Sequence, residues 1–209
     1  MRSGPCRKGG DWAWRLKSAA TAVRVRDVHE DVEKVLIDEA VIGRRLDVMA
    51  EQILAEFAER EFVVVVILKG ALVFMADLLR RMPLPLEIEC VNVASYHGGT
   101  ASSGRVDFLD RKLPDVQGKD VLLVDDILDT GRTLAAVGER LRRQGAAKVK
   151  SCVLLSKDRI RAVEVVADYV GFDIGDEFVV GYGLDFQGLY RNLPYIGVLK
   201  EEVIGKKLS

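Results

Sequence analysis

Histidine and cysteine are scarce in this 209-residue sequence, which has only His29, His97, Cys6, Cys90 and Cys152. The cysteines are far apart, odd in number and form no C-x-x-C pair, so we expect neither a disulfide framework nor a zinc site of His/Cys type. Light cysteine use indicates a reducing compartment, and we expect a cytoplasmic protein. Any metal is expected to be a hard cation held by carboxylates and ligand oxygens.

The sequence also lacks long apolar runs and an excess of charge of one sign. No run approaches the ~20 residues that a membrane helix needs. The net charge is −1, which does not indicate a strongly basic face for nucleic acid. Neither a membrane nor a nucleic acid is therefore an expected partner. The 49% hydrophobic and 30% charged residues are ordinary values for a globular domain with a full core.

Residues 1–27 differ in composition from the rest of the chain. Basic residues are frequent there, and Asp11 is the only acidic residue before residue 27. Two interpretations apply, an arginine-rich targeting peptide or an extension that is poorly ordered or docks loosely. The second is favoured because the stretch lacks the apolar core of a secretory signal. We therefore expect an extension over 1–27 and a single domain over 28–209.

Strand and helix signals alternate from Asp38 onwards. Residues 38–57 repeat apolar side chains at steps of three and four, with Asp38 as a possible helix cap. Residues 62–68 form a continuous β-branched run, typical of a strand buried on both faces. The remaining signals are helices over 71–82 and 134–145 and strands over 86–93, 121–124 and 149–155. This alternation predicts an α/β fold with a mainly parallel central sheet flanked by helices.

The last third of the chain has a different pattern. Residues 169–172, 178–182 and 195–199 predict short strands joined by loops. We expect them to form a small hood against the sheet, built from N- and C-terminal segments.

The strongest chemical signal is an acidic loop, residues 125–133, after the strand over 121–124. Thr130, Gly131 and Thr133 are expected to open a helix, whose N-terminal N–H groups make an anion site. Asp125 and Asp126 are unfavourable beside an anion unless they meet hydroxyls or a cation, and a ribose diol or Mg²⁺ would satisfy them. The loop therefore predicts a ribose 5-phosphate site in the crevice beyond the strand ends. The predicted ribose and phosphate residues are Asp125, Asp126, Asp129, Thr130, Gly131, Arg132 and Thr133.

A plainer alternative is that the three aspartates are solvated turn and cap residues. Three of them together with Thr-Gly-x-Thr after a buried strand make this alternative weaker. Other nucleotide-binding patterns do not compete, because the sequence has no Walker loop. Its glycine cluster around Gly181 and Gly183 also lacks the third glycine and the following helix of a dinucleotide fingerprint.

Residues 125–133 resemble the phosphoribosyl pyrophosphate loop of the type I phosphoribosyltransferases, and other segments narrow the resemblance to the hypoxanthine-guanine branch. These segments are Leu68-Lys69-Gly70, Ser156-Lys157-Asp158 and the tail over 178–194. The resemblance covers about residues 38–204. It departs mildly at Asp125, where many relatives have Glu, and at Arg132, where some have Lys.

The resemblance implies a role for each matching residue. Leu68, Lys69, Gly70 and Arg191 would bind pyrophosphate, and Ser95 and Tyr96 would head a mobile loop that closes over the site. Lys157 would donate to the exocyclic O6 of a 6-oxopurine, Phe178 would stack on the base and the Val179 backbone would read its edge. Asp185 would lie beside the base and, with Asp125 and Asp126, would hold Mg²⁺. Asp129 is the implied catalytic residue, at N7 of the purine.

The implied reaction converts hypoxanthine or guanine and phosphoribosyl pyrophosphate to IMP or GMP and pyrophosphate, through a transition state that resembles an oxocarbenium ion. A xanthine-guanine or adenine-type transferase remains an alternative. A regulator that binds phosphoribosyl pyrophosphate without catalysis is another. We expect a homodimer or homotetramer, as the resemblance implies.

Overall fold

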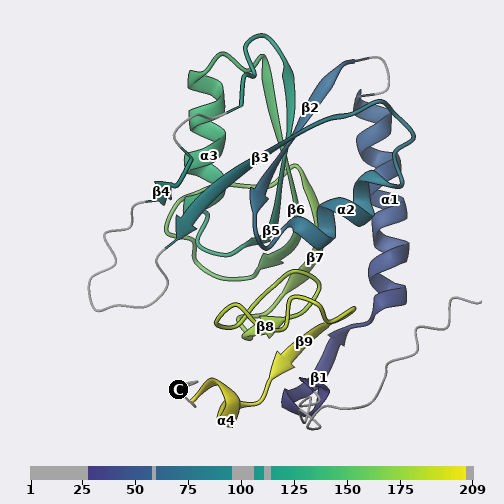
Figure 1. Cartoon of the computed structure of the whole chain (residues 1–209), viewed down its shortest axis with the longest axis vertical. Coiled ribbons are helices and arrows are strands. Elements are labelled where there is room, and N and C mark those ends of the chain that lie inside the picture. The colour runs from purple at the N-terminus through teal and green to yellow at the C-terminus, as the bar shows by residue number, and fades with distance from the viewer. Residues whose placement is uncertain (1–27, 58–59, 96–105, 111–113, 206–209) are drawn as a thin grey trace, which may run out of the picture.

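The computed structural model describes residues 28–57, 60–95, 106–110 and 114–205. They form a six-stranded sheet of order β4-β3-β2-β5-β6-β7 and a three-stranded sheet of order β1-β9-β8. Figure 1 shows the smaller sheet below the larger one. The helices are η1 (Val28–Asp31, 3₁₀), α1 (Glu39–Phe57), α2 (Leu72–Leu79), α3 (Arg132–Arg143) and α4 (Glu201–Ile204). The strands are β1 (Val32–Ile37), β2 (Phe62–Leu68), β3 (Glu87–Ser95), β4 (Val106–Phe108), β5 (Asp120–Leu128), β6 (Lys148–Lys157), β7 (Tyr169–Ile174), β8 (Val179–Val180) and β9 (Ile196–Leu199).

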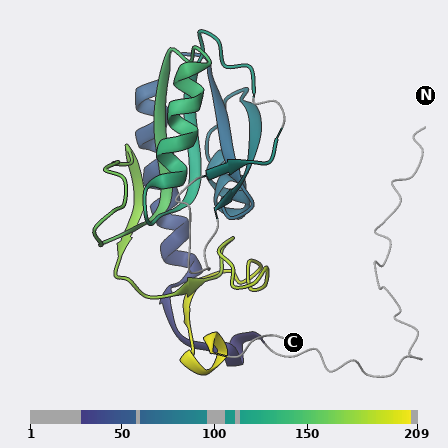
Figure 2. The same cartoon turned by 90° about the vertical axis from the view of Figure 1, so that its left-hand side faces the viewer.

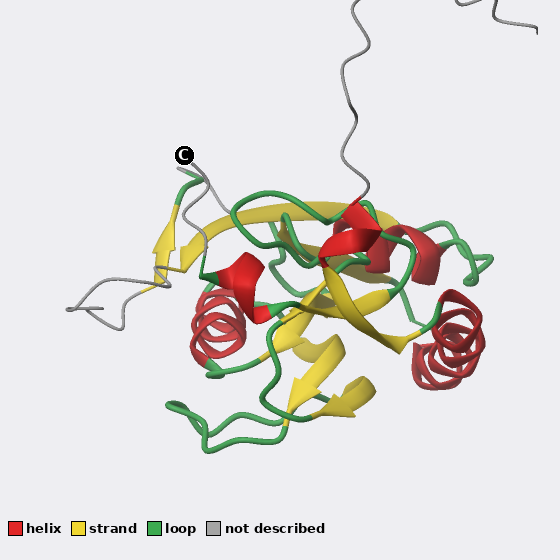
Figure 3. Ribbon diagram, turned by 90° about the horizontal axis from the view of Figure 1, so that it is seen from below, coloured by secondary structure: helices red, strands yellow, loops and turns green. Residues whose placement is uncertain are grey.

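Strand β2 shows how the sequence makes a sheet that is covered on both faces. Successive side chains of a strand point to opposite faces. Accordingly, Val64 and Val66 pack in the cluster that contains the buried side chains of α1 and α2. Val63 and Val65 pack instead with Leu134, Val137 and Leu141 of α3. Figures 1 and 3 show the helices on both sides of the strands, which confirms the expected α/β architecture.

Helix α1 begins as its sequence predicts. The Val41 N–H donates to Asp38 Oδ1 at 2.9 Å, which satisfies one of the free donors of the first turn. The predicted apolar stripe is buried, with Ile42, Leu46, Met49 and Ile53 at 0% exposure. Among the described residues, no helix is both long and apolar enough to span a membrane.

The order of the large sheet reverses between β2 and β5. All its neighbouring strands are parallel except β3 and β4, which pair antiparallel. From β2 the chain moves outward to β3, and from β5 it moves outward in the other direction to β6 and β7. Ligands of open α/β sheets bind beyond the carboxyl ends of the strands at such a reversal. Lys69-Gly70 and the acidic loop therefore meet at the position where a ligand is expected.

Two expectations about the strands are wrong, one about the end of β5 and one about the sheet to which residues 169–172 belong. Strand β5 does not end at Val124 but runs to Leu128, so Asp125 and Asp126 lie in a strand and not in a turn. Pairing with β2 stops at Val124, whereas pairing with β6 continues to Leu128. Pairing with β6 alone is therefore enough to extend β5 beyond Val124, the last residue of the apolar run that predicts this strand.

The second correction concerns residues 169–172, which belong to the large sheet and not to the hood. Strand β7 pairs parallel with β6, and Gly171 allows this close approach, because a Cβ there would lie 2.4 Å from the Leu154 carbonyl oxygen. Arg45 of α1 donates to the carbonyls of Val170 and Gly171 at 2.6 and 2.8 Å. These bonds supply donors for two carbonyl groups of β7, which is the edge strand and has no further neighbour in the described sheet.

The hood consists of β1, β8, β9 and the loop over 181–195. Strand β1 pairs antiparallel with β9, from Val32 opposite Leu199 to Ile37 opposite Ile196. Figures 1 and 2 show these first and last described segments side by side at one end of the sheet. The predicted hood of N- and C-terminal segments is confirmed, although β1 itself gave no clear strand signal in the sequence.

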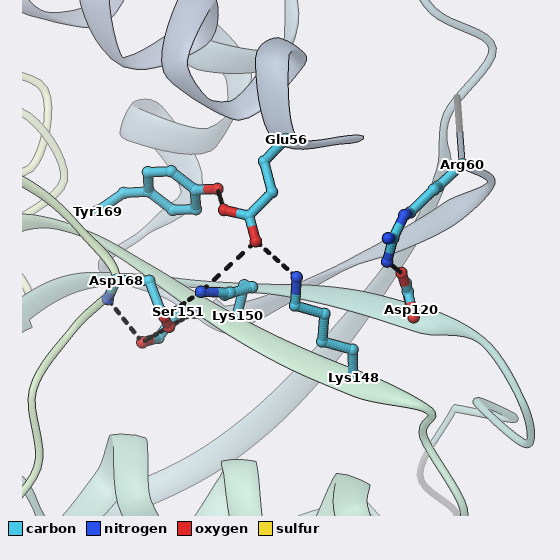
Figure 4. A network of polar contacts seen from close by, with 8 residues as sticks. All are labelled: Glu56, Arg60, Asp120, Lys148, Lys150, Ser151, Asp168 and Tyr169. Atoms are coloured by element: carbon cyan, nitrogen blue, oxygen red, sulfur yellow. Dashed lines mark hydrogen bonds and ion pairs between the residues drawn. The ribbon is translucent and has the colours of Figure 1, made fainter. Parts of the chain in front are cut away.

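A polar network ties the end of α1 to β6 and β7, at the end of the sheet away from the acidic loop (Figure 4). Glu56 Oε1 accepts from Lys148 Nζ at 2.6 Å, and its other oxygen accepts from the Tyr169 hydroxyl. Lys150 Nζ lies 3.5 Å from Glu56 and 2.8 Å from Asp168. The hydrogen bond from Lys148, with that from Tyr169, lowers the pKa of Glu56 from 4.5 to about 2.

Glu56→Gln is expected to lower the free energy of unfolding at pH 7 by about 1–2 kcal/mol, after allowance for solvent screening of a partly exposed network. A carboxylate with a lowered folded-state pKa stabilises the fold above its unfolded pKa. The difference from the wild type should therefore shrink as pH falls from 4.5 towards 2. Urea unfolding at pH 7, 4 and 3 measures it. Glu139→Gln removes an exposed pair with Arg143 and should cost less than about 0.5 kcal/mol.

Candidate active site

A cavity of about 680 Å³ lies between the carboxyl ends of β2, β5 and β6 and the hood. This volume is within the usual range for a site that encloses a small molecule. The predicted site residues that line it are Leu68, Lys69, Gly70, Asp125, Asp126, Asp129, Thr130, Gly131, Thr133, Lys157, Phe178, Val179, Asp185 and Arg191. Arg132, the first residue of α3, is not among the described lining residues. Ser95 ends β3, and Tyr96 lies outside the described residues.

Asp125 and Asp126 are neighbouring carboxylates with little access to water. Asp125 is 5% exposed, and its Oδ1 accepts from the Asp126 N–H at 3.0 Å. Asp126 Oδ1 accepts from the Ile127 N–H at 2.9 Å. Burial raises the pKa of both carboxyls, and the adjacent charge of Asp126 raises that of Asp125 further. Two such groups favour a ligand that supplies hydroxyl donors or positive charge.

The N-terminus of α3 forms the expected anion cradle. Gly131 immediately precedes the helix with φ +79° and, as a glycine, has no side chain that could cap the first turn. The first N–H groups of α3 therefore have no acceptor from the N-cap side chain and can meet an anion. A Cβ on residue 131 would lie 2.6 Å from the Val163 carbonyl oxygen, so both the backbone angle and the lack of space require glycine here.

The segment after β2 is wedged between the acidic pair and the hood. The Leu68–Lys69 peptide bond is cis. A Cβ on Gly70 would lie 1.6 Å from Asp126 Oδ2, and a Cβ on Gly183 would lie 2.0 Å from the Gly70 carbonyl oxygen. Gly70 and Gly183 thus allow the acidic loop, the Lys69-Gly70 segment and the hood loop at Gly183 to pack against one another at van der Waals distance. Lys69 is presented to the cavity from the middle of this stack.

The hood side of the cavity combines an aromatic ring with an ion pair. Phe178 is 43% exposed, and its ring meets that of Phe186 edge to face, with centroids 5.5 Å apart. Arg191 contacts Asp185 Oδ1 at 2.6 Å and donates to the Gly183 carbonyl at 2.6 Å. Asp185 thus shares the cavity with Asp125 and Asp126, but no group of three or more His, Cys, Asp or Glu that could hold a metal occurs among the described residues.

Lys157, the last residue of β6, lines the same cavity as the acidic loop and Phe178. Its side chain is 11% exposed, and Nζ lies 3.5 Å from Asp176 Oδ1. Arg159 contacts Asp176 at 3.2 Å and Asp129 at 3.1 Å. No sequence motif points to a role for Asp176 or Arg159. Their only signal in the sequence is that they lie two residues from Phe178 and from Lys157.

Other lining residues were also missed. Phe186 and Gln187 directly follow Asp185, so the tail pattern could have indicated them. Ile127, Leu184 and Val93 look like ordinary apolar strand or loop residues and carry no such signal.

Comparison with known proteins agrees with this geometry. The family model for the phosphoribosyl transferase domain matches residues 37–187. A curated Staphylococcus epidermidis hypoxanthine-guanine phosphoribosyltransferase is 45% identical over 179 residues, 86% of this chain and 100% of the relative. The chain belongs to the hypoxanthine-guanine phosphoribosyltransferase family. Within this family, a solved Staphylococcus aureus hypoxanthine phosphoribosyltransferase aligns with a TM-score of 0.81 at 41% identity, covering 88% of this chain and 100% of that one.

Some similar members of the family are longer proteins. The bifunctional protein TilS/HprT of Listeria monocytogenes is 45% identical over 176 residues, which are 84% of this chain. This chain matches only 27% of the length of that relative.

Proposed function

We propose that this chain transfers the 5-phosphoribosyl group of phosphoribosyl pyrophosphate to N9 of hypoxanthine or guanine, forming IMP or GMP. The bond between C1 and the pyrophosphate oxygen breaks, the bond between C1 and N9 forms, and the base loses a proton. The observation that carries the proposal is that Lys157 and Phe178 share one cavity with the acidic pair and the anion cradle of α3. The names of the relatives support the same activity.

The side chains around the sugar divide its recognition between them. The first turn of α3, with Thr130 and Thr133, binds the 5-phosphate, and the acidic pair faces the ribose diol. Arg132 is the first residue of that turn, and we propose that it contributes to phosphate binding by this position in the helix. Lys69 and Arg191 bind the departing pyrophosphate, and the charges of both stabilise it as the bond breaks.

The base is recognised by stacking and by one charged donor. Phe178 stacks on the purine, an interaction of about 1–3 kcal/mol per base, and the Val179 backbone reads its edge. Lys157 can donate to O6 but cannot accept, so an amino group at that position would leave both groups unpaired. Asp129 hydrogen-bonds at N7 or takes the proton there, which makes N9 more nucleophilic.

Magnesium fits the residues present. Burial disfavours the charged forms of Asp125 and Asp126, and the adjacent charge of Asp126 adds to this at Asp125, so a cation bound by these oxygen ligands would relieve both effects. The absence of a carboxylate cage in the described residues agrees with an ion bound through one or two carboxylates and substrate phosphates. We propose Asp125 and Asp126 on the sugar side and Asp185 beside the base as its protein partners. When bound, the ion would neutralise charge on the pyrophosphate.

A substrate panel tests the proposal. With phosphoribosyl pyrophosphate and Mg²⁺, hypoxanthine or guanine should release pyrophosphate with kcat/KM at least about 10⁴-fold above adenine, because a site built for one hydrogen-bond pattern rejects the opposite one. Adenine or xanthine as the best substrate would assign the chain to another transferase of the fold. Tight binding of phosphoribosyl pyrophosphate without pyrophosphate release for any purine would indicate a regulator.

The proposal also covers the domain organisation, the assembly, the location and the mobile loop. Residues 28–209 act as a single domain, and residues 1–27, which lie outside the described residues, are an N-terminal extension. The chain assembles as a homodimer or homotetramer and works in the cytoplasm. Ser95 and Tyr96 head a loop that closes over the bound substrates.

A further inference from the structure

Arg159 joins two loops that meet the substrates from different sides. Its Nη1 donates to Asp129 Oδ1 at 3.1 Å and to Asp176 Oδ1 at 3.2 Å. Asp129 follows β5 in the acidic loop, whereas Asp176 lies between β7 and β8, two residues before Phe178. One guanidinium therefore ties the acid proposed to act at the purine N7 to the loop that carries the stacking ring.

The contact with Asp129 is the more sheltered of the two. The Asp129 side chain is 24% exposed and that of Asp176 is 63% exposed. Exposed ion pairs are screened by water and contribute little, so Asp129 is the partner for which Arg159 matters. Its Oδ1 is occupied by Arg159, whereas Oδ2 accepts no hydrogen bond within the ranges that the structure describes. One oxygen of Asp129 is thus fixed and the other is available to a ligand in the cavity.

The loop that carries Arg159, residues 158–168, is itself fixed to the acidic loop. The Val163 N–H donates to the Thr130 carbonyl at 3.2 Å, and the Val163 carbonyl lies where a side chain on Gly131 would be. Arg161 holds the loop from within, with bonds to the Val165 carbonyl at 3.1 Å and to Ser156 Oγ at 3.0 Å. Arg159 is therefore presented to Asp129 from a supported position and not from a free loop.

We propose that Arg159 is a positioning residue, which holds Asp129 by Oδ1 so that Oδ2 faces N7 of the bound purine. Arginine suits this role because its planar group keeps a fixed direction and its charge is permanent. The inference rests on the proposed function, since it assigns Arg159 to the same transfer reaction.

Removal of Arg159 is expected to affect turnover more than binding. Arg159→Ala should lower kcat by about 10- to 100-fold, because misplacement of a reacting group by about 1 Å can cost this much. KM for hypoxanthine and for phosphoribosyl pyrophosphate should stay within about threefold, because the stacking ring and the phosphate cradle are intact. Arg159→Lys keeps the charge but not the planar group of fixed direction, so it should recover only part of the lost kcat. Arg143→Ala, which removes an exposed arginine paired with Glu139 on α3, is the matched control and should leave both parameters unchanged.

Asp176→Asn separates the two partners of Arg159. The pair with Asp129 remains in this variant, so kcat should fall by less than about threefold, as expected for a screened surface contact. A loss as large as that of Arg159→Ala would show that Arg159 acts through Asp176, and would overturn the assignment to Asp129.

A double-mutant cycle with Asp129→Asn decides the proposal. If Arg159 acts only by placing Asp129, Arg159→Ala should change kcat by less than about twofold in the Asp129→Asn background. Equal losses in both backgrounds would mean that Arg159 has a general structural effect, and the inference would then be wrong while the transfer activity stands. A wild-type protein that releases no pyrophosphate would refute the proposed function itself, and the inference with it.

Discussion

Asp129→Asn is expected to lower kcat for hypoxanthine and guanine by about 10²-fold or more, the usual scale for general acid–base catalysis. The amide keeps the size of the side chain and its bond from Arg159 but cannot take a proton. Binding of phosphoribosyl pyrophosphate should change little, because the anion cradle at Gly131 and the first turn of α3 is untouched. Steady-state release of pyrophosphate measures kcat, and calorimetric titration measures the binding of phosphoribosyl pyrophosphate.

Asp120→Asn is the matched control, since Asp120 lies at the other end of the same strand, β5, and pairs with Arg60. Its kcat should stay within about twofold of the wild type, as for other partly exposed pairs. If Asp129→Asn also stayed near the wild type, Asp129 would lose its assigned role, and the double-mutant cycle for Arg159 would lose its basis.

Gly70→Ala should abolish most of the activity, with kcat/KM for phosphoribosyl pyrophosphate reduced by about 10²-fold or more. The new methyl group would lie 1.6 Å from Asp126 Oδ2, so either Asp126 or the Lys69-Gly70 segment must move. A shift of about 1 Å at a group that orients the substrate can account for a loss of this size. The overall fold should persist, because the displaced groups line a cavity and are not part of the apolar core.

Gly118→Ala is the control for the backbone effect of losing a glycine. Gly118 has φ +72°, but among the described residues no atom beyond its two chain neighbours lies within 4 Å of an added Cβ. It should therefore lower stability by about 1–2 kcal/mol through backbone strain and leave kcat/KM unchanged. Thermal unfolding separates the two effects. An active Gly70→Ala enzyme would show that the stack at Asp126 can relax without harm to the site.

Much of the large sheet was predictable because its signals are local. The cap at Asp38, the stripe of α1 and the β-branched run of β2 each follow from short-range patterns. The end of β5 was not predictable, because it depends on pairing with β6 and not on residues 125–128 themselves. Strand β1 was missed for a related reason, since its burial depends on β9, far away in the chain. Strand β7 was predicted as a strand but placed in the hood, because its pairing with β6 depends on the packing of two segments and not on residues 169–172 alone.

The site also has parts with local sequence signals and parts that depend on contacts between distant segments. The acidic loop and the tail over 178–194 are continuous segments whose residue types suit the proposed ligand, so sequence patterns could indicate them. The side chains of Arg159 and Asp176 meet only after the loops around β6 and β7 have packed. Their contacts depend on distances between segments, about which a single sequence carries no direct information.

The pairing of β1 with β9 has a consequence for the time at which the protein becomes competent during its synthesis. Chains fold progressively from the N-terminus as they emerge from the ribosome. All strands of the large sheet have been made by Ile174, whereas β8, β9 and Arg191 come later. The part of the site proposed to bind ribose 5-phosphate can therefore form before β9 has been made and has paired with β1. A nascent chain in this condition would have the anion cradle and Lys157 but would lack Phe178 and Arg191, so transfer activity should be the last property that the growing chain acquires.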